Sequence, residues 1–213
     1  MARPGPLAVL VGALTLSMLS GCITGERPTL SESPGAPGEP TGDGAVDAVL
    51  TLLDAAATAR FSADYTVLTR FGGTNTDAEV IQLSPDRRTV TVGDIQFRVD
   101  GDDTSTCNLG SGDCASGVQE RRISDVQITH RFYAEQAAIR LRRDAQARIG
   151  NTDAQKTRIA GRPATCVSIP QDGGTVQYCA LDSGVLALVD DADVHIELTS
   201  YDDSVAESDL AAD

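Results

Sequence analysis

The chain has 213 residues, of which 31 are acidic and 17 basic, and its formal net charge is −14. Aromatic residues make up only 4% and tryptophan is absent, so a core must be built mainly from Ala, Val, Leu and Ile. This length predicts one domain. A chain this acidic is a poor candidate for binding nucleic acid, whose phosphates require a basic surface, and no nucleic-acid partner is expected.

Residues 1–21 have the pattern of a secretory signal peptide. Arg3 supplies a positive charge, and the apolar run 7–19 is shorter than the about 20 residues that a membrane-spanning helix needs. The residues LSGC that end at Cys22 resemble the bacterial lipobox. This resemblance implies that Cys22 becomes a lipidated N-terminus, which anchors the protein to the cell membrane on its extracytoplasmic side. The alternative is an ordinary secreted protein with a cysteine near its cleavage site.

Polar segments flank the region that is predicted to fold. Residues 22–44 are dense in Pro, Gly, Ser and Thr and nearly lack large apolar side chains. They cannot bury enough surface to order themselves, so they are predicted to form a disordered tether. Residues 206–213 predict an acidic tail. The folded domain is therefore expected to span residues 45–205.

Hydrophobic periodicity predicts a helix followed by strands in the first half of this domain. Apolar residues recur at helical spacing in residues 45–60. From Phe61 the pattern changes to alternation, which is typical of a strand with one solvated face. The strands predicted here are 61–71, 78–83, 88–92 and 95–99, the second and third joined by a turn at Pro85.

A second helix is predicted for residues 131–149, with Phe132, Ala138, Ile139 and Leu141 on its apolar side. It lies within a basic segment, residues 121–162. The functional interpretation of this segment is a basic face for anionic lipid headgroups or cell-wall polymers. The favoured alternative is a solvated helix face that is balanced by an acidic tail.

Residues 162–181 predict a hairpin that turns at Asp172-Gly173, a favoured type I′ pair. Pairing residues whose numbers sum to 345 places Cys166 opposite Cys179 at a non-hydrogen-bonded position, where side chains approach closely enough for a disulfide. Pro170, which lacks an N–H, falls at another such position.

The cysteine count agrees with this register. Removing Cys22 as the lipid site leaves four of the five cysteines, which can form two disulfides in an oxidising compartment. We expect Cys166–Cys179 and therefore Cys107–Cys114. The two interleaved pairings stay open from the sequence alone.

Two further strands, 185–189 and 194–201, complete the pattern at about eight antiparallel strands and two helices. The helix, strands, helix, strands order predicts an α+β domain: a curved antiparallel sheet, or open half-barrel, with two covering helices.

Four segments resemble a known family. They are FSADYTV (61–67), IAGRPATCVSI (159–169), TVQYCALDSGVLALV (175–189) and VHIELTSY (194–201). Together with the lipobox and the tether, they are similar to the LolA/LprG/LppX-like lipoproteins, and most of all to uncharacterised lipoproteins of high-GC bacteria. The resemblance implies a half-barrel that holds a lipid between sheet and helices. It implies a ligand cavity lined by Leu50, Leu53, Tyr65, Val67, Val80, Phe97 and Ile139, although the same residues suit a filled core.

Motifs of enzyme chemistry are missing from the sequence. His130 and His195 belong to no metal-ligand or nucleophile motif. The acidic run 190–193 lacks the spacing of a calcium loop, so a solvated turn is the better interpretation. No metal, cofactor or catalytic residue is expected, and a hydrolase is only a third hypothesis. The first hypothesis is an anchored, non-enzymatic lipoprotein that binds or carries a lipid or other apolar ligand. The second is a tethered sensor or interaction module with a packed core, which docks an envelope protein or polymer through its basic helix or its exposed sheet.

Overall fold

The computed structural model describes residues 38–211. The predicted signal peptide, the lipidation site Cys22 and most of the predicted tether lie outside these residues and stay predictions. Within the described part of the chain, the helices are too short or too polar to cross a membrane.

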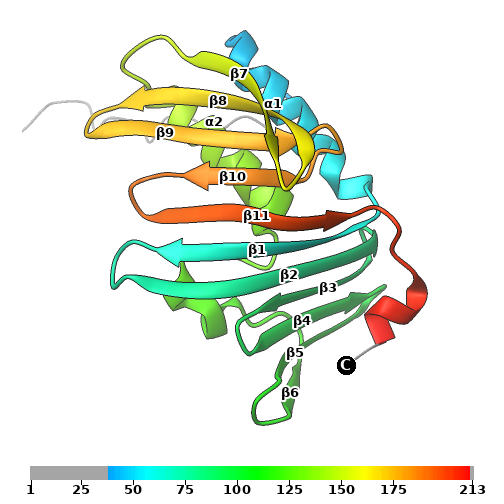
Figure 1. Cartoon of the computed structure of the whole chain (residues 1–213). Coiled ribbons are helices and arrows are strands. Elements are labelled where there is room, and N and C mark those ends of the chain that lie inside the picture. Colours follow the sequence, from blue (N-terminus) through cyan, green and yellow to red (C-terminus); the bar gives the residue numbers. More distant parts are fainter. Residues whose placement is uncertain (1–37, 212–213) are drawn as a thin grey trace, which may run out of the picture. The chain divides into compact units, whose positions relative to one another are not determined.

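One open antiparallel sheet of 11 strands forms the framework (Figure 1). The chain forms β1 to β6 from the centre of the sheet outwards, and β7 to β11 from the opposite edge back to the centre, where β11 pairs with β1. In sheet order the strands are β6 (Asp113–Ser116), β5 (Asp103–Asn108), β4 (Ile95–Asp100), β3 (Arg87–Val92), β2 (Thr74–Ser84), β1 (Phe61–Thr69), β11 (Val194–Asp202), β10 (Leu186–Asp190), β9 (Gly174–Leu181), β8 (Arg162–Gln171) and β7 (Asp153–Ile159).

The helices cover one face of this sheet and lie behind it in Figure 1. Helix α1 packs on β8 and β9, α2 packs beside α1 and on β8, and the turn η2 lies against β1. The fold is therefore α+β, with an open antiparallel sheet and helices on one face, as the sequence predicts. The helical segments are α1 (Gly44–Ala55), η1 (Ala56–Thr58), η2 (Glu120–Val126), η3 (Phe132–Gln136), α2 (Ala137–Gln146) and η4 (Glu207–Ala211).

Helix α1 is capped at both ends by side chains. The Asp43 carboxylate accepts hydrogen bonds from the backbone N–H groups of Ala45 and Val46, which satisfies donors of the first turn. At the other end the side-chain amide of Gln82 donates to the carbonyls of Ala56, at 3.0 Å, and Ala59, at 2.8 Å. The α-helix predicted for 45–60 therefore ends at Ala55 and continues only as the short turn η1 to Thr58, and Gln82 on β2 satisfies carbonyls of the segment that follows α1.

The predicted helix 131–149 is divided into two parts. Residues Phe132–Gln136 form a single π turn, and a regular α-helix follows only from Ala137 to Gln146. The hydroxyl of Tyr178 on β9 donates to the Asp144 carboxylate at 2.5 Å, which ties α2 to the inner face of the sheet. The helix thus packs through a polar contact as well as through its apolar side.

The strand prediction is right for the centre of the sheet and incomplete at its edges. All eight predicted strands are present, but β5, β6 and β7 are missing from the prediction. The residues of β7 are nearly all exposed, so the strand has no apolar alternation that could reveal it. Strand β2 also begins at Thr74 rather than at residue 78: its first four residues pair with β1 but are polar, so they show no apolar alternation.

The predicted β8–β9 register is confirmed, with Cys166 opposite Cys179 and Pro170 opposite Thr175. Disulfides join Cys166 to Cys179 and Cys107 to Cys114, as expected. The predicted turn type is wrong. A type I′ turn needs a positive φ at both central residues, but of Asp172 and Gly173 only Gly173 has one, at 99°, which fits a type II turn.

Candidate functional site

Six of the seven residues predicted to line a lipid cavity are buried in the core, and one of them, Tyr65, also borders the concavity described below. Their exposed fractions are between 0 and 3%, and they belong to one continuous cluster of buried residues: Leu50, Leu53, Tyr65, Val67, Val80 and Phe97. Side chains that line a cavity wide enough for an acyl chain would retain more accessible surface. These six residues therefore fill the space between sheet and helices.

Tyr65 illustrates this packing. Its ring lies edge-on to Phe132 with centroids 4.9 Å apart, and its hydroxyl donates to the carbonyl oxygen of Leu186 at 3.0 Å. Burial raises the pKa of the Tyr65 hydroxyl well above its ordinary value. Both the ring and the hydroxyl of Tyr65 are thus engaged by neighbours within the fold.

The seventh predicted cavity residue, Ile139, is a correction. Its side chain is 47% exposed. Along α2 the buried stripe is formed by Ala138, Leu141 and Ala145, which recur at helical spacing, and Ile139 falls on the other side of the helix. Ile139 is therefore not part of the interior.

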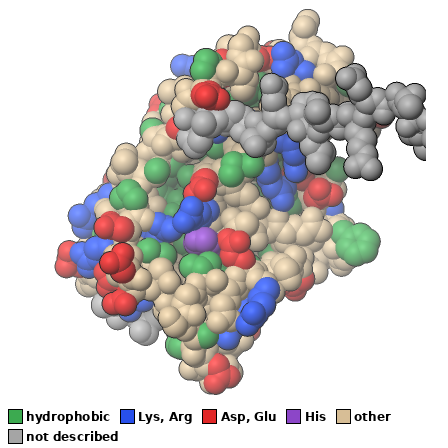
Figure 2. Space-filling view, turned by 180° about the vertical axis from the view of Figure 1, so that it is seen from behind, with side chains coloured by type: hydrophobic (Ala, Val, Ile, Leu, Met, Phe, Trp, Pro, Cys, Tyr) green, Lys and Arg blue, Asp and Glu red, His purple; other side chains and the backbone are tan. Residues whose placement is uncertain are grey.

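Most arginines of the basic segment 121–162 do not present their charges freely. Six of them pair with carboxylates of the described residues: Arg131 with Glu135, Arg140 with Asp191, Arg142 with Asp54, Arg143 with Asp144, Arg148 with Asp43, and Arg162 with Asp203. Seen from behind, Figure 2 shows basic and acidic side chains next to one another at several places. The charges of α2 are therefore paired locally, but Arg142 and Asp144 are buried, so this helix does not present a fully solvated charged face.

The two histidines and the acidic turn also have local partners. His130 is nearly buried, with its Nδ1 atom 2.6 Å from Glu120, whereas His195 lies 3.5 Å from the carboxylates of both Asp190 and Glu197. Asp191 accepts hydrogen bonds from two backbone N–H groups of its own turn. Among the described residues, no three His, Cys, Asp or Glu side chains are grouped so that they could hold a metal ion.

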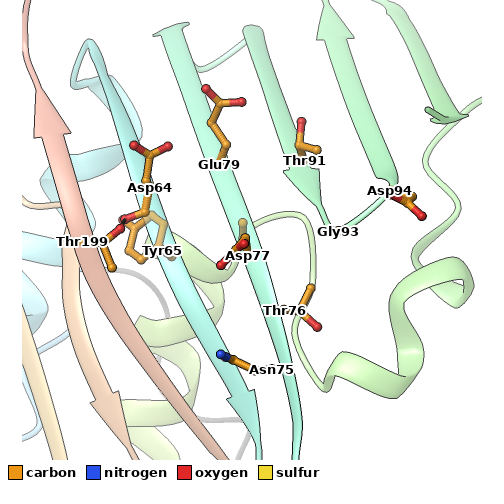
Figure 3. A pocket seen from close by; sticks show the side chains of 11 residues that line it. Asp64, Tyr65, Asn75, Thr76, Asp77, Glu79, Thr91, Gly93, Asp94 and Thr199 are labelled. Carbon is orange, nitrogen blue, oxygen red and sulfur yellow. Dashed lines mark hydrogen bonds between the residues drawn. The ribbon is translucent and has the colours of Figure 1, made fainter. Parts of the chain in front are cut away.

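The outer face of the sheet, opposite the helices, carries a concavity of about 810 Å³ (Figure 3). We call it the acidic concavity, because four carboxylates from neighbouring strands and turns line it. Its polar lining residues are Asp64 on β1, Asn75, Thr76, Asp77 and Glu79 on β2, Thr91 on β3, Asp94 in the β3–β4 turn and Thr199 on β11.

Strand register brings these carboxylates together. Asp64 on β1 lies directly opposite Glu79 on β2. Asp77 precedes Glu79 by two residues, so it projects from the same face of the sheet. Figure 3 shows the side chains of Asp64 and Glu79 projecting in the same direction. No Lys or Arg lines the concavity, so its charge is uniformly negative.

The sequence alone did not predict this site. The alternation of residues 61–71 places Asp64 on a solvated face, which the structure confirms. It did not group Asp64 with Glu79 and Asp94, because that grouping depends on the pairing of β1 with β2 and of β3 with β4. The exposed acids at the start of β2 are the signal that could have suggested it.

Comparison with known proteins gives distant structural likenesses only. No protein-family model and no curated protein matches the chain. Among solved structures, the crystal structure of MucB is 17% identical, with a TM-score of 0.48 over 79% of this chain and 63% of that one. MucB in complex with MucA(peri) is 14% identical with a TM-score of 0.42 over 76% and 56%, and the Pseudomonas aeruginosa MucA/MucB complex is 15% identical with 0.44 over 78% and 60%.

The chain thus spans less than two thirds of the solved chains it matches. At these TM-scores the likeness assigns neither a family nor a function to this protein. The resemblance to LolA/LprG/LppX-like lipoproteins agrees with the observed open sheet and covering helices, and membership in that family stays a prediction.

Proposed function

We propose that this chain is a non-enzymatic lipoprotein of the cell envelope, anchored to the membrane through Cys22 on the extracytoplasmic side. Its folded domain is a docking module that binds a basic segment of a partner protein in the acidic concavity. The lipobox and the polar tether support the anchor. The filled interior and the acidic concavity support docking on the outer face over carriage of a lipid inside.

The single observation that carries the docking role is the cross-strand pair Asp64–Glu79. The two side chains lie directly opposite one another on neighbouring strands, so both project from the same face of the sheet. Asp77 and Asp94 add further negative charge to the same concavity. A cationic segment complements this charge, so the arrangement favours recognition of Lys and Arg side chains.

The partner is expected to be an extended peptide segment and not a metal ion. The four carboxylates come from β1, β2 and the β3–β4 turn, and the described residues group no three ligands closely enough for a metal. Lys and Arg side chains spaced along a peptide can each meet a separate carboxylate. The strands that carry these carboxylates hold them in place before binding, which reduces the entropy cost of association.

The test compares two double variants that remove the same charge. The probe is a fluorescein-labelled peptide of alternating Lys and Thr, titrated with the full chain at several salt concentrations. Asp64→Asn with Glu79→Gln should weaken binding by about tenfold and reduce its salt dependence. Asp102→Asn with Asp103→Asn, at the exposed β4–β5 turn and the first residue of β5, should leave binding within about twofold of the parent.

Stability gives an independent readout for the same variants. Asn and Gln keep the size of the side chains that they replace on the outer face of the sheet, so the double variant should stay folded, with a free energy of unfolding within about 1 kcal/mol of the parent. Weaker binding by a folded and equally stable variant would support the proposal. Equal weakening by both double variants would contradict it, because binding would then depend only on net charge.

Lipid carriage, the first hypothesis from the sequence, requires the six buried core residues to separate and admit an acyl chain. Native mass spectrometry of the full chain distinguishes the two functions, since docking predicts no lipid beyond the anchor itself. A lipid that stays bound to Cys22→Ser, which lacks the anchor, would contradict the docking proposal.

The same Cys22→Ser variant also tests the anchor. It should move from the membrane fraction to the soluble fraction if Cys22 is the lipidated residue.

A further inference from the structure

The free edge of the sheet at β7 has the properties of a second docking site. Strand β7 pairs with β8 along all of its seven residues and has no other strand neighbour. Residues 153–158 are all exposed, although α1 contacts the strand from one face of the sheet. Unlike several other pairs in the sheet, the β7–β8 ladder contains no bulge, so the edge is straight and regular.

Register shows which backbone groups of β7 are available. The β7–β8 hairpin turns at Ala160-Gly161, both with positive φ, and Ile159 opposite Arg162 is the closing pair. Hydrogen-bonded pairs alternate from there, so the N–H and C=O groups of Thr157, Gln155 and Asp153 point to β8. Those of Ala154, Lys156 and Arg158 point away from the sheet. Within residues 38–211, no hydrogen bond from another element reaches these outward groups.

The opposite edge differs. Strand β6 has only four residues, and the Cys107–Cys114 disulfide joins it to β5. Short edge strands are one of the means by which proteins limit pairing with other chains. The β7 edge is longer and offers a ladder of three residues to an incoming strand, which is the geometry used in recognition by strand addition.

The basic side chains of β7 indicate which kind of strand can pair with this edge. Ala154 lies opposite Val167, which in turn pairs with Tyr178, so alternation places Lys156 and Arg158 together on the helix side of the sheet. In the register that uses all three outward residues, a second copy that adds antiparallel about a two-fold axis would place Lys156 of one copy directly opposite Lys156 of the other. Like charges directly opposite are destabilising, so the edge disfavours self-pairing.

We propose that β7 is a docking edge at which an extended acidic segment of a partner protein adds as a further strand. The incoming strand makes backbone hydrogen bonds with Ala154, Lys156 and Arg158. It places Asp or Glu side chains at alternate positions, opposite Lys156 and Arg158. In the sheet order, this edge is distant from the acidic concavity on β1 and β2. The role of the edge is therefore independent of the function proposed above.

The test uses two synthetic probes, an acetylated peptide of alternating Glu and Val and its counterpart with Lys in place of Glu. Each is titrated with the full chain, and amide hydrogen exchange is measured on the free and the saturated protein. The Glu peptide should bind at least tenfold more tightly than the Lys peptide. It should slow exchange at Ala154, Lys156 and Arg158, whose N–H groups are solvated in the free chain.

Variants separate backbone pairing from simple charge attraction. Lys156→Glu with Arg158→Glu should weaken the Glu peptide at least tenfold and reverse the preference between the two peptides. Lys156→Pro removes an outward N–H without removing a bond to β8, so it should abolish binding of the Glu peptide. Arg98→Glu with Arg121→Glu makes the same charge change in other parts of the chain and should leave its binding within about twofold.

Three results would overturn this proposal. One is equal binding of both peptides, and another is protection of amides elsewhere than in β7. The third is a dimer of the full chain that protects the β7 amides, because a second copy would then be the occupant. Circular dichroism of each variant confirms that it is folded, and the charge variants retain the test if the proline variant does not fold.

Discussion

His130 is a nearly buried titratable side chain held between three charged neighbours. Its Nδ1 atom lies 2.6 Å from the Glu120 carboxylate, and its Nε2 atom accepts a hydrogen bond from Nε of Arg131 at 3.2 Å. On the sheet side its ring lies 5.7 Å from that of Phe97, and Arg88 on β3 adds a second positive charge nearby. Burial lowers the pKa of His130 below its ordinary value, against the opposing effect of Glu120, and the two arginines lower it further.

This environment predicts a loss of stability in mild acid. His130 is neutral in both states above the unfolded-state pKa of about 6.5, so its full contribution is present there. As the pH falls through that value, the unfolded chain binds the proton first, and the free energy of unfolding decreases by at most about 1.4 kcal/mol per pH unit until the folded pKa is passed. Denaturant unfolding between pH 8 and pH 5 measures this slope.

Two variants isolate the contribution of His130 from those of the many carboxylates. His130→Gln should lose this part of the pH dependence, so the stability difference between parent and variant should change with pH. His195→Gln, at a half-exposed position on β11, should retain the slope of the parent. An unchanged slope in His130→Gln would show that the histidine is not the group responsible.

At the scale of elements, local chemistry explains why some features were predictable. The β8–β9 register follows from a turn pair and two facing cysteines, all within 20 residues of sequence, and every predicted pair is present. The edge strands β5, β6 and β7 have no such signal, because a strand with little to bury need not alternate. Ile139 was misplaced for a related reason: a short helix rich in Ala leaves more than one side available as its apolar face.

Gly184 sets the distance between helix α1 and the β9–β10 turn. A Cβ atom at this position would lie 2.3 Å from the carbonyl oxygen of Leu52 and 2.8 Å from the backbone nitrogen of Ala56. Both contacts are with backbone, which cannot rotate away, so Gly184→Ala must displace α1 from the sheet. We expect a loss of about 3 kcal/mol or more in the free energy of unfolding, measured with denaturant.

Gly161 provides the matched control for this variant. It also has a positive φ, 74° against 92° for Gly184, but no atom lies within 4 Å of the added Cβ. Gly161→Ala therefore carries only the backbone strain of about 1–2 kcal/mol. Equal losses in the two variants would mean that backbone strain alone, and not contact with α1, explains why position 184 requires glycine.

At the scale of the whole molecule, the pairing that closes the fold joins the first strand to the last. Thr69 of β1 lies opposite Val194 of β11, and the two strands form the centre of the sheet. Local sequence patterns predict hairpins and helices. They do not predict the pairing of β1 with β11 or the grouping of carboxylates in the acidic concavity, because both depend on residues far apart in the sequence. The sequence thus predicted the fold class and most elements, and it placed Asp64 on a solvated strand face, but it did not predict the candidate site.

The central position of β11 leads to a prediction about truncation. A chain that ends at Asp193 lacks β11 and loses the buried side chains of Val194, Ile196 and Leu198. It would leave β1 and β10 as unpaired edges in the middle of the sheet, so it should show no cooperative unfolding transition in denaturant.

A chain that ends at Ala206 removes only η4 and the last residues, and it keeps the buried Val205, whose carbonyl accepts a hydrogen bond from Nε of Arg60 at 2.8 Å. The ion pair that it loses, Arg87 with Glu207, is solvent-exposed and contributes at most about 1 kcal/mol. This chain should therefore unfold cooperatively with a free energy within about 1 kcal/mol of the parent. A larger loss of unfolding free energy in this chain would place the end of the domain beyond the predicted residue 205. Cooperative unfolding of the chain that ends at Asp193 would show that the two halves of the sheet do not depend on the β1–β11 pairing.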